Sequence, residues 1–184
     1  MFGAIFFSLW FFAPAGFSNL AAFASGKIRF LKKYNFPVDC NIRFRGKRLL
    51  GSHKTVRGFV VAVLVGIISC ALEVFVYRQS FMIRELMPVD YYTIDPIILG
   101  TLLGFGALAG DSIKSFFKRQ AGIQPGRSWF PFDQIDYILG GIVFSLLYTQ
   151  LSFVQYLVLF IVWFLVHPLM TGIGYFFKLR HKPI

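Results

Sequence analysis

The chain has 184 residues, of which 57% are hydrophobic and 15% are charged, and its formal net charge is +11. Soluble domains carry about 25% charged residues, so this composition excludes a water-soluble protein. The apolar residues also fall into blocks of membrane length, and we therefore expect a single all-α, polytopic membrane domain that covers 1–184.

Five apolar stretches approach the length of about 20 residues that crosses a bilayer as a helix. They are roughly Phe2–Ala24, Gly58–Tyr77, Ile94–Phe117, Ile135–Gln150 and Phe153–Phe177. The fourth is shorter than the others. The sequence thus predicts five transmembrane helices joined by short connections.

The charges of the connections predict the orientation of these helices. Residues 27–57 contain ten Lys or Arg and one acid, residues 111–133 contain four Lys or Arg, and the tail after residue 177 adds three more. The connection over 78–95 has two Arg against three acids. Because short cationic loops stay in the cytoplasm, we expect the N-terminus outside, the C-terminus inside and two functional cytoplasmic loops in a plasma-membrane protein. The net positive charge then lies on the cytoplasmic side of the membrane. We expect no nucleic-acid partner.

Two polar features lie inside the first two spans. Pro14, Gly16 and Asn19 interrupt the first apolar run. An Asn within a span marks a helix contact or a polar cavity, although a simple kink explains the same residues. Glu73 lies near the outer end of the second span, where its side chain can reach the interface by snorkelling.

The stretch "GKRLLGSHKTVRG" over Gly46–Gly58 is dense in glycine, cations and hydroxyl groups and leads into the second span. It lacks the residue order of a Walker phosphate-binding loop. It has the composition to cradle a triphosphate or a lipid phosphate beside the membrane. Its candidate substrate-binding residues are Lys47, Arg48, His53, Lys54, Thr55 and Arg57.

Three carboxylates gather at the cytoplasmic end of the third and fourth spans. Asp111 lies near the end of the third span, and Asp133 and Asp136 open the fourth with a spacing that places both on one helix face. Carboxylates this close repel one another unless they are compensated. One interpretation pairs Asp111 with a nearby Lys and sets the other two against a helix dipole. In the other interpretation, divalent cations compensate the negative charge, and hard oxygen ligands favour Mg²⁺.

Cations accompany these acids along the same stretch. They are Lys114, Lys118, Arg119 and Arg127. Lys binds phosphate as a point charge and Arg binds it bidentately, so the group suits a phosphate-bearing substrate. The same residues are also ordinary partners of a helix end and ordinary cytoplasmic anchors.

The acids and cations together resemble a known signature. "GD" at Gly110-Asp111, "KR" at Lys118-Arg119 and "DxxD" at Asp133–Asp136 are similar to the motif of CDP-diacylglycerol synthases, which are larger and carry Arg where this chain has Gln134. The chain resembles more closely the small five-helix CDP-archaeol synthases of archaea. Three elements carry that resemblance in order: Pro14–Asn19, Gly46–Gly58 and Gly110–Asp136.

The resemblance implies a reaction in which CTP and an archaetidic-acid-type lipid phosphate give CDP-archaeol and pyrophosphate at the cytoplasmic side. It implies Mg²⁺ as cofactor, as two ions that Mn²⁺ can replace, linked to Asp111, Asp133 and Asp136. By the same resemblance, Lys118 and Arg119 meet phosphate, and Lys54, Thr55 and Arg57 hold CTP or the lipid head group.

Other functions remain open from the sequence. The same chemistry on an ester-linked phosphatidic acid would use the same residues. A CDP-alcohol phosphotransferase needs the pattern D-G-x-x-A-R…G-x-x-x-D-x-x-x-D on its helices, which this chain lacks, since its acids are spaced by three. A non-enzymatic protein that binds anionic lipid would not need the acids, and a transporter would place them near the middle of the bilayer. The oligomeric state is not indicated.

Overall fold

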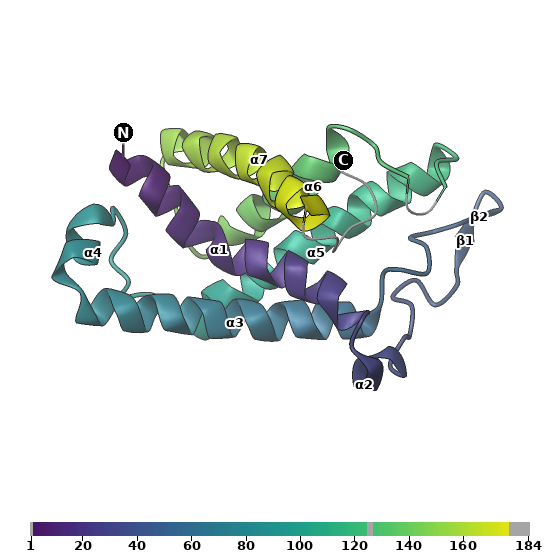
Figure 1. Cartoon of the computed structure of the whole chain (residues 1–184), viewed down its shortest axis with the longest axis horizontal. Helices are drawn as coiled ribbons and strands as arrows, with labels where there is room; N and C mark the ends of the chain where they lie inside the picture. Colours follow the sequence, from purple (N-terminus) through teal and green to yellow (C-terminus); the bar gives the residue numbers. More distant parts are fainter. Residues whose placement is uncertain (1, 125–126, 177–184) are drawn as a thin grey trace.

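The computed structural model describes residues 2–124 and 127–176, with side chains to Pro168, and Figure 1 shows how its helices are arranged. Its long helices are α1 (Phe2–Ser25), α3 (Val56–Gln79), α5 (Pro96–Gln120), α6 (Phe132–Ser145) and α7 (Phe153–Phe176). Its short elements are α2 (Arg29–Lys32), α4 (Phe81–Leu86) and a hairpin of β1 (Arg43–Phe44) and β2 (Lys47–Arg48). The predicted helical class is confirmed, and the additions among the described residues are the short helices α2 and α4 and the hairpin.

Three of the five predicted spans are confirmed by length and composition, and they are α1, α3 and α5. Helix α6 has 14 residues, which at about 1.5 Å each fall short of the roughly 30 Å of a bilayer core. It begins three residues before the predicted start and ends at Ser145, before a turn, rather than at Gln150. Of α7, the apolar part with described side chains is Phe153–Pro168.

The connections lie at two opposite ends of the bundle (Figure 1). The α1–α3 connection, with α2 and the hairpin, lies at the same end as the α5–α6 connection. Helix α4 lies at the other end, which is also the end of the chain's N-terminus. The two cation-rich connections therefore share one end of the molecule.

Small residues let α5 approach both of its neighbours closely. A Cβ atom at Gly100 would collide with the backbone of Gly66 on α3, and one at Gly110 would collide with the carbonyl of Asp136 on α6. Gly140 of α6 meets the backbone of Gly110 in the same way. Close backbone approach through small residues is the usual way to pack helices in lipid, where burial of apolar surface gives little. This contact fixes the start of α6 against the last turns of α5.

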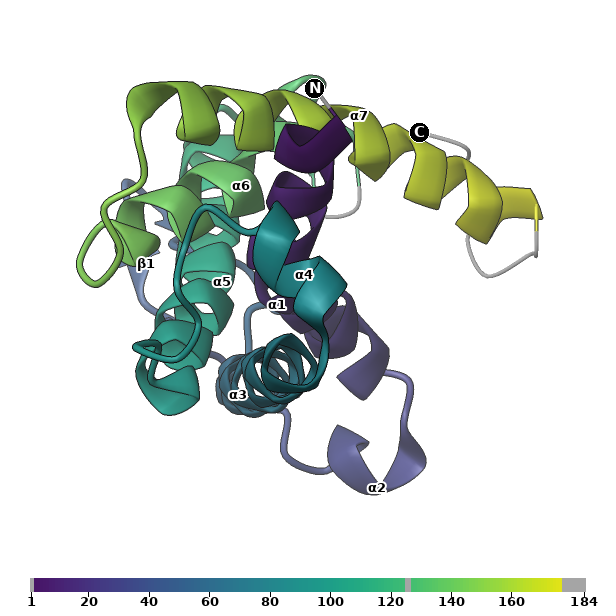
Figure 2. The same cartoon turned by 90° about the vertical axis from the view of Figure 1, so that its left-hand side faces the viewer.

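Helix α7 lies across the bundle and covers α1 and α6 (Figure 2). Trp163 anchors it, since its indole Nε1 donates a hydrogen bond to the carbonyl of Ser8 at 2.9 Å. The ring of Phe12 meets the same indole edge-on, with centroids 5.5 Å apart. Phe12 also contacts Tyr137 of α6, so these aromatic residues join three helices.

Two features inside the spans extend the sequence analysis. Helix α1 runs from Phe2 to Ser25 with Pro14 inside it, so Pro14 and Gly16 do not end the helix. Glu73 does not snorkel to the interface: it is 8% exposed, and the connection after α4 places the fully buried Tyr91 nearby. No hydrogen-bond partner for Glu73 Oε2 is present among the described residues.

Candidate active site

Three segments meet at the cation-rich end of the bundle. They are the last turns of α5, the first turn of α6 and the segment that precedes α3. Between α5 and the segment that precedes α3 lies a cavity of about 160 Å³, which we call the lysine-lined cavity. Its lining residues are Leu50, Gly51, His53, Lys54, Asp111, Lys114, Ser115, Lys118 and Arg119.

Helical spacing explains why α5 presents so many of these groups to one place. Asp111, Lys114, Ser115 and Lys118 recur every three or four residues, so they share one face of the helix. The hydroxyl of Ser115 is held by the Asp111 carbonyl at 2.8 Å. The face therefore carries one carboxylate and two ammonium groups toward α6 and the cavity.

The three predicted carboxylates converge on the ammonium group of Lys114. Its Nζ lies 3.1 Å from Asp111 Oδ1, 2.8 Å from Asp133 Oδ1 and 2.5 Å from Asp136 Oδ2. An ammonium group has three N–H donors, so it can give one hydrogen bond to each carboxylate. The acids from two helices thus share one cation.

Two further lysines complete what we call the acid–lysine cluster, which consists of Asp111, Asp133, Asp136, Lys54, Lys114 and Lys118. Lys54 forms an ion pair with Asp111 Oδ2. Lys118 Nζ lies 3.0 Å from both oxygens of Asp133. Three acids face three lysines, so the cluster is electrically balanced without any added ion.

Backbone groups orient the two acids of α6. The N–H of Trp129 donates to Asp133 Oδ2 at 2.5 Å, and the N–H of Tyr137 donates to Asp136 Oδ1 at 2.6 Å. Asp133 lies in the first turn of the helix, where the dipole favours a carboxylate. The structure therefore contains the lysine pairing and the dipole contact of the first interpretation.

Arg119 offers an unpartnered donor beside the lysine-lined cavity. Its side chain lines the cavity, and its Nε is buried without a hydrogen-bond partner among the described residues. A buried guanidinium N–H without a partner is costly, and a phosphate oxygen would satisfy it.

Asp39 organises the connection that brings Lys54 to the cavity, and the sequence argument missed its role. Its carboxylate accepts two hydrogen bonds from Arg48, at 3.2 and 3.1 Å, and others from the N–H groups of Leu50 and Gly51. Burial opposes ionisation of Asp39, but these hydrogen bonds outweigh it and lower the pKa to about 2. The signal in the sequence was that Asp39 is the only acid in a connection with ten cations.

Several predicted substrate-binding residues are held by the chain itself. Arg48 is engaged by Asp39, and Lys47 Nζ donates to the Gln120 carbonyl at 2.7 Å. Thr55 caps α3 by accepting a hydrogen bond from the Gly58 N–H. These contacts hold the α1–α3 connection against the end of α5. They give Arg48, Lys47 and Thr55 a structural role in place of the predicted substrate contact.

Arg57 is also held away from the cavity. Its Nε donates to Ser25 Oγ at 3.2 Å and its Nη1 donates to the Leu31 carbonyl at 3.0 Å, which ties the end of α1 to the start of α3. Asn19 is half-buried on α1, and Arg127 is exposed in the α5–α6 connection. Neither lines the lysine-lined cavity, whereas His53 does.

The donor set suits a hard divalent cation, although none of the described residues forms a ready metal site. Within the described residues, no three His, Cys, Asp or Glu side chains are arranged to hold an ion. The three carboxylates nevertheless all reach one position, which the Lys114 ammonium fills. Carboxylate oxygens are what Mg²⁺ prefers, so the residues fit this ion if Lys114 moves.

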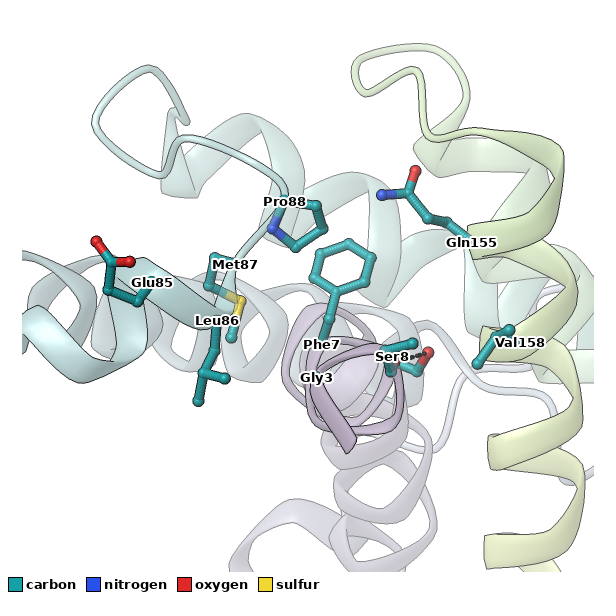
Figure 3. A pocket seen from close by; sticks show the side chains of 10 residues that line it. Gly3, Phe7, Ser8, Glu85, Leu86, Met87, Pro88, Gln155 and Val158 are labelled. Carbon is teal, nitrogen blue, oxygen red and sulfur yellow. Dashed lines mark hydrogen bonds between the residues drawn. The ribbon is translucent and has the colours of Figure 1, made fainter. Parts of the chain in front are cut away.

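A second cavity, of about 330 Å³, lies at the opposite end of the bundle between α1, the end of α4 with the residues that follow it, and α7 (Figure 3). Phe7, Leu86, Met87, Pro88 and Val158 make it largely apolar. It contains none of the clustered acids and lysines, so the larger cavity is not the phosphate-binding candidate.

Comparison with known proteins places the chain among membrane lipid enzymes. A family model described as CarS-like, CDP-archaeol synthase, matches residues 1–183. The CDP-archaeol synthase of Methanospirillum hungatei is 32% identical and aligns over 90% of this chain and 95% of its own length. Those of Methanosarcina barkeri and Methanopyrus kandleri are each 33% identical, covering 92% and 95% of this chain and 98% and 91% of their own. A solved structure of an intramembrane enzyme for archaeal membrane lipid biosynthesis superposes with a TM-score of 0.69 at 25% identity, over 88% of this chain and 90% of that one.

Proposed function

The chain belongs to the CDP-archaeol synthase family, and from this we propose that it is a CTP-dependent cytidylyltransferase that converts 2,3-bis-O-geranylgeranylglycerol 1-phosphate to CDP-archaeol and pyrophosphate. The observation that carries the proposal within the chain is the acid–lysine cluster beside the lysine-lined cavity. This arrangement joins carboxylates for a metal ion to cations for phosphates at one end of a helical membrane protein.

The chemistry needs positioning and charge more than a strong base. An oxygen of the lipid phosphate attacks the α-phosphorus of CTP, and the bond from that phosphorus to the oxygen bridging to the β-phosphate breaks, so pyrophosphate leaves. The attacking group is already an anion. The main barrier is the approach of two polyanions, and fixed cations lower it by stabilising both the approach and the charge that grows on the leaving group.

The contacts of the residues that line the cavity indicate which of them can bind phosphate. Arg119 has an unpartnered Nε for a phosphate contact, and Lys118 and Lys54 each have an ammonium at the cavity wall. His53 lines the same space and can donate a hydrogen bond to a phosphate or sugar oxygen, whereas the Ser115 hydroxyl, which donates to the Asp111 carbonyl, can accept one from a ribose hydroxyl. We propose that this wall holds the triphosphate of CTP.

We propose that Asp111, Asp133 and Asp136 hold Mg²⁺, which Mn²⁺ can replace. The support is the convergence of all three carboxylates on one cationic position. Bound there, the ion would neutralise phosphate charge beside the cavity.

We propose that the cation-rich end faces the cytoplasm and that α1, α3, α5, α6 and α7 all lie in the membrane. The shared end of the two cationic connections supports this orientation (Figure 1). A site at that interface receives CTP from water and the lipid from the bilayer.

A transfer assay tests the proposal. Purified protein in detergent with Mg²⁺ and radiolabelled CTP should form labelled lipid from the ether-linked archaetidic acid. An ester-linked phosphatidic acid of matched chain length measures selectivity, and Asp111→Asn supplies the inactive control. Product from neither acceptor would reject the function, and product from the ester lipid alone would reassign the substrate.

A further inference from the structure

Lys114 links the three carboxylates more completely than any other described cation. Lys54 contacts Asp111 and Lys118 contacts Asp133, whereas Lys114 contacts all three acids. Among the described side chains, it alone forms an ion pair with Asp136, whose side chain is 5% exposed. The ammonium therefore stands at the point where the negative charge of the cluster is concentrated.

We propose that Lys114 occupies the divalent-cation position of the acid–lysine cluster in the free enzyme and vacates it when the ion binds with the nucleotide. The proposal rests on the proposed function, because it takes CTP as the ligand. A single-charged ammonium with three donors and a divalent ion with oxygen ligands compete for the same three carboxylates. The two cannot share one position.

The lysine-lined cavity gives the displaced ammonium a place to go. Lys114 is one of the residues that line this cavity, beside Lys118 and Arg119, so its side chain already borders both the acids and the proposed phosphate site. A Lys side chain carries a compact ammonium group on a flexible four-carbon stem, so the charge is readily redirected. Rotation into the cavity would move the charge from carboxylates to phosphates.

The exchange changes the charge that the nucleotide meets. The free cluster is balanced, with three carboxylates against three lysines. A divalent ion that takes the place of the ammonium leaves the six residues and the ion with a surplus of two positive charges beside the cavity. The surplus attracts a polyanion, so ion and nucleotide should bind cooperatively, and by linkage each should strengthen the other equally.

The test measures Mn²⁺ binding by the full-length protein without nucleotide, from the loss of the free-ion electron paramagnetic resonance signal. Lys114→Met removes the competing ammonium and should tighten nucleotide-free Mn²⁺ binding by roughly 10- to 100-fold, the span of common coupling energies. Lys114→Arg keeps a cation among the acids and should bind Mn²⁺ as weakly as the wild type. Melting temperature and gel filtration establish that each variant is folded.

Lys118→Met is the matched control for bulk charge, because it removes one lysine that pairs with Asp133 alone. A much smaller gain in Lys118→Met than in Lys114→Met supports the exchange. Equal gains, or no gain in Lys114→Met, would overturn it. Where Lys114→Met does not fold, Lys114→Gln keeps amide donors for the carboxylates and provides the same comparison.

Retention of labelled CTP by the wild type in Mn²⁺ separates the two proposals. Retained CTP with no Mn²⁺ gain in Lys114→Met overturns the exchange and leaves the proposed function intact. Failure to retain CTP, together with failure to form lipid product, rejects the proposed function, and the nucleotide-free comparison still decides whether Lys114 competes with the ion.

Discussion

Asp136 and Asp133 occupy the same helix turn but have different surroundings. Asp133 receives two lysines and the Trp129 N–H, whereas Asp136 is more buried and depends on Lys114. The spacing of the two acids in the sequence predicted that they share one helix face. Their shared contact with Lys114 confirms this prediction. The sequence suggested a lysine partner for Asp111, but not that one lysine contacts all three acids, because the reach of a long side chain depends on how closely two helices approach.

Asp136→Asn should remove activity while leaving the fold intact. The substitution keeps the side-chain shape but removes a buried carboxylate from the proposed ion position, and loss of one such electrostatic group costs about 10²- to 10³-fold in rate. Initial rates with saturating CTP and Mg²⁺ measure the effect. Glu85→Gln, exposed at the other end of the bundle, is the control and should remain active. Substantial activity in Asp136→Asn would remove Asp136 from the proposed site.

Arg57→Lys distinguishes the two roles given to Arg57. The resemblance implies a phosphate contact, but the structure places its guanidinium on Ser25 and the Leu31 carbonyl. Lys cannot make both contacts, so unfolding should become easier by about 1–3 kcal/mol. Thermal unfolding in detergent should show this loss, with the KM for CTP nearly unchanged. An unchanged melting temperature with a raised KM would return Arg57 to the phosphate site.

The helices were easier to predict than the connections between them. The bounds of α1, α3 and α5 follow from their apolar runs, and the cap at Thr55 fixes where α3 begins. The two-residue strands of the hairpin have no periodicity to detect, and the role of Asp39 depends on Arg48 and two backbone N–H groups brought back by a turn. Sequence alone also could not show that α6 ends early.

Gly110→Ala should separate α5 from α6 and thereby disturb the site. A Cβ at this position would overlap the Asp136 carbonyl, so the helices must move apart, at a cost of about 1–3 kcal/mol. Both the melting temperature and the activity should fall. Gly3→Ala is the control, because its Cβ meets only Leu86 at 4.0 Å. Equal stability of the two variants would mean that the close contact does not set the spacing of the helices.

Asp39→Asn tests whether the Asp39 carboxylate holds the first connection. The pKa of Asp39 is about 2, below the ordinary value near 3.9, so its stabilisation is present above about pH 4 and is lost as pH falls toward 2. In the wild type, hydrogen exchange at the amides of Leu50 and Gly51, corrected for intrinsic rates, should speed up across this window. In Asp39→Asn the exchange should be fast already at pH 7, with no step on acidification. A step that persists in the variant would assign the effect to another group.

The chain as a membrane protein has a chemical asymmetry between its two ends. The acid–lysine cluster and both cationic connections lie at one end, while α4 and the apolar cavity of about 330 Å³ lie at the other (Figures 1 and 3). Composition predicted membrane insertion. The charges of the connections predicted that the two cationic connections would lie at the same end of the bundle. The short α6 and the oblique α7 depend on packing that the hydropathy of each segment does not contain (Figure 2).

The two cysteines allow the orientation to be tested without a reporter fusion. Cys40 is exposed in the first cationic connection, whereas Cys70 is fully buried on α3. If this connection is cytoplasmic, a membrane-impermeant maleimide should label the protein in inverted vesicles and leave it unlabelled in intact spheroplasts. Cys40→Ser should abolish the label in both preparations, which assigns it to Cys40. Labelling in spheroplasts would place the connection outside, and the acids, the lysines and the lysine-lined cavity would then face away from the cytoplasmic supply of CTP.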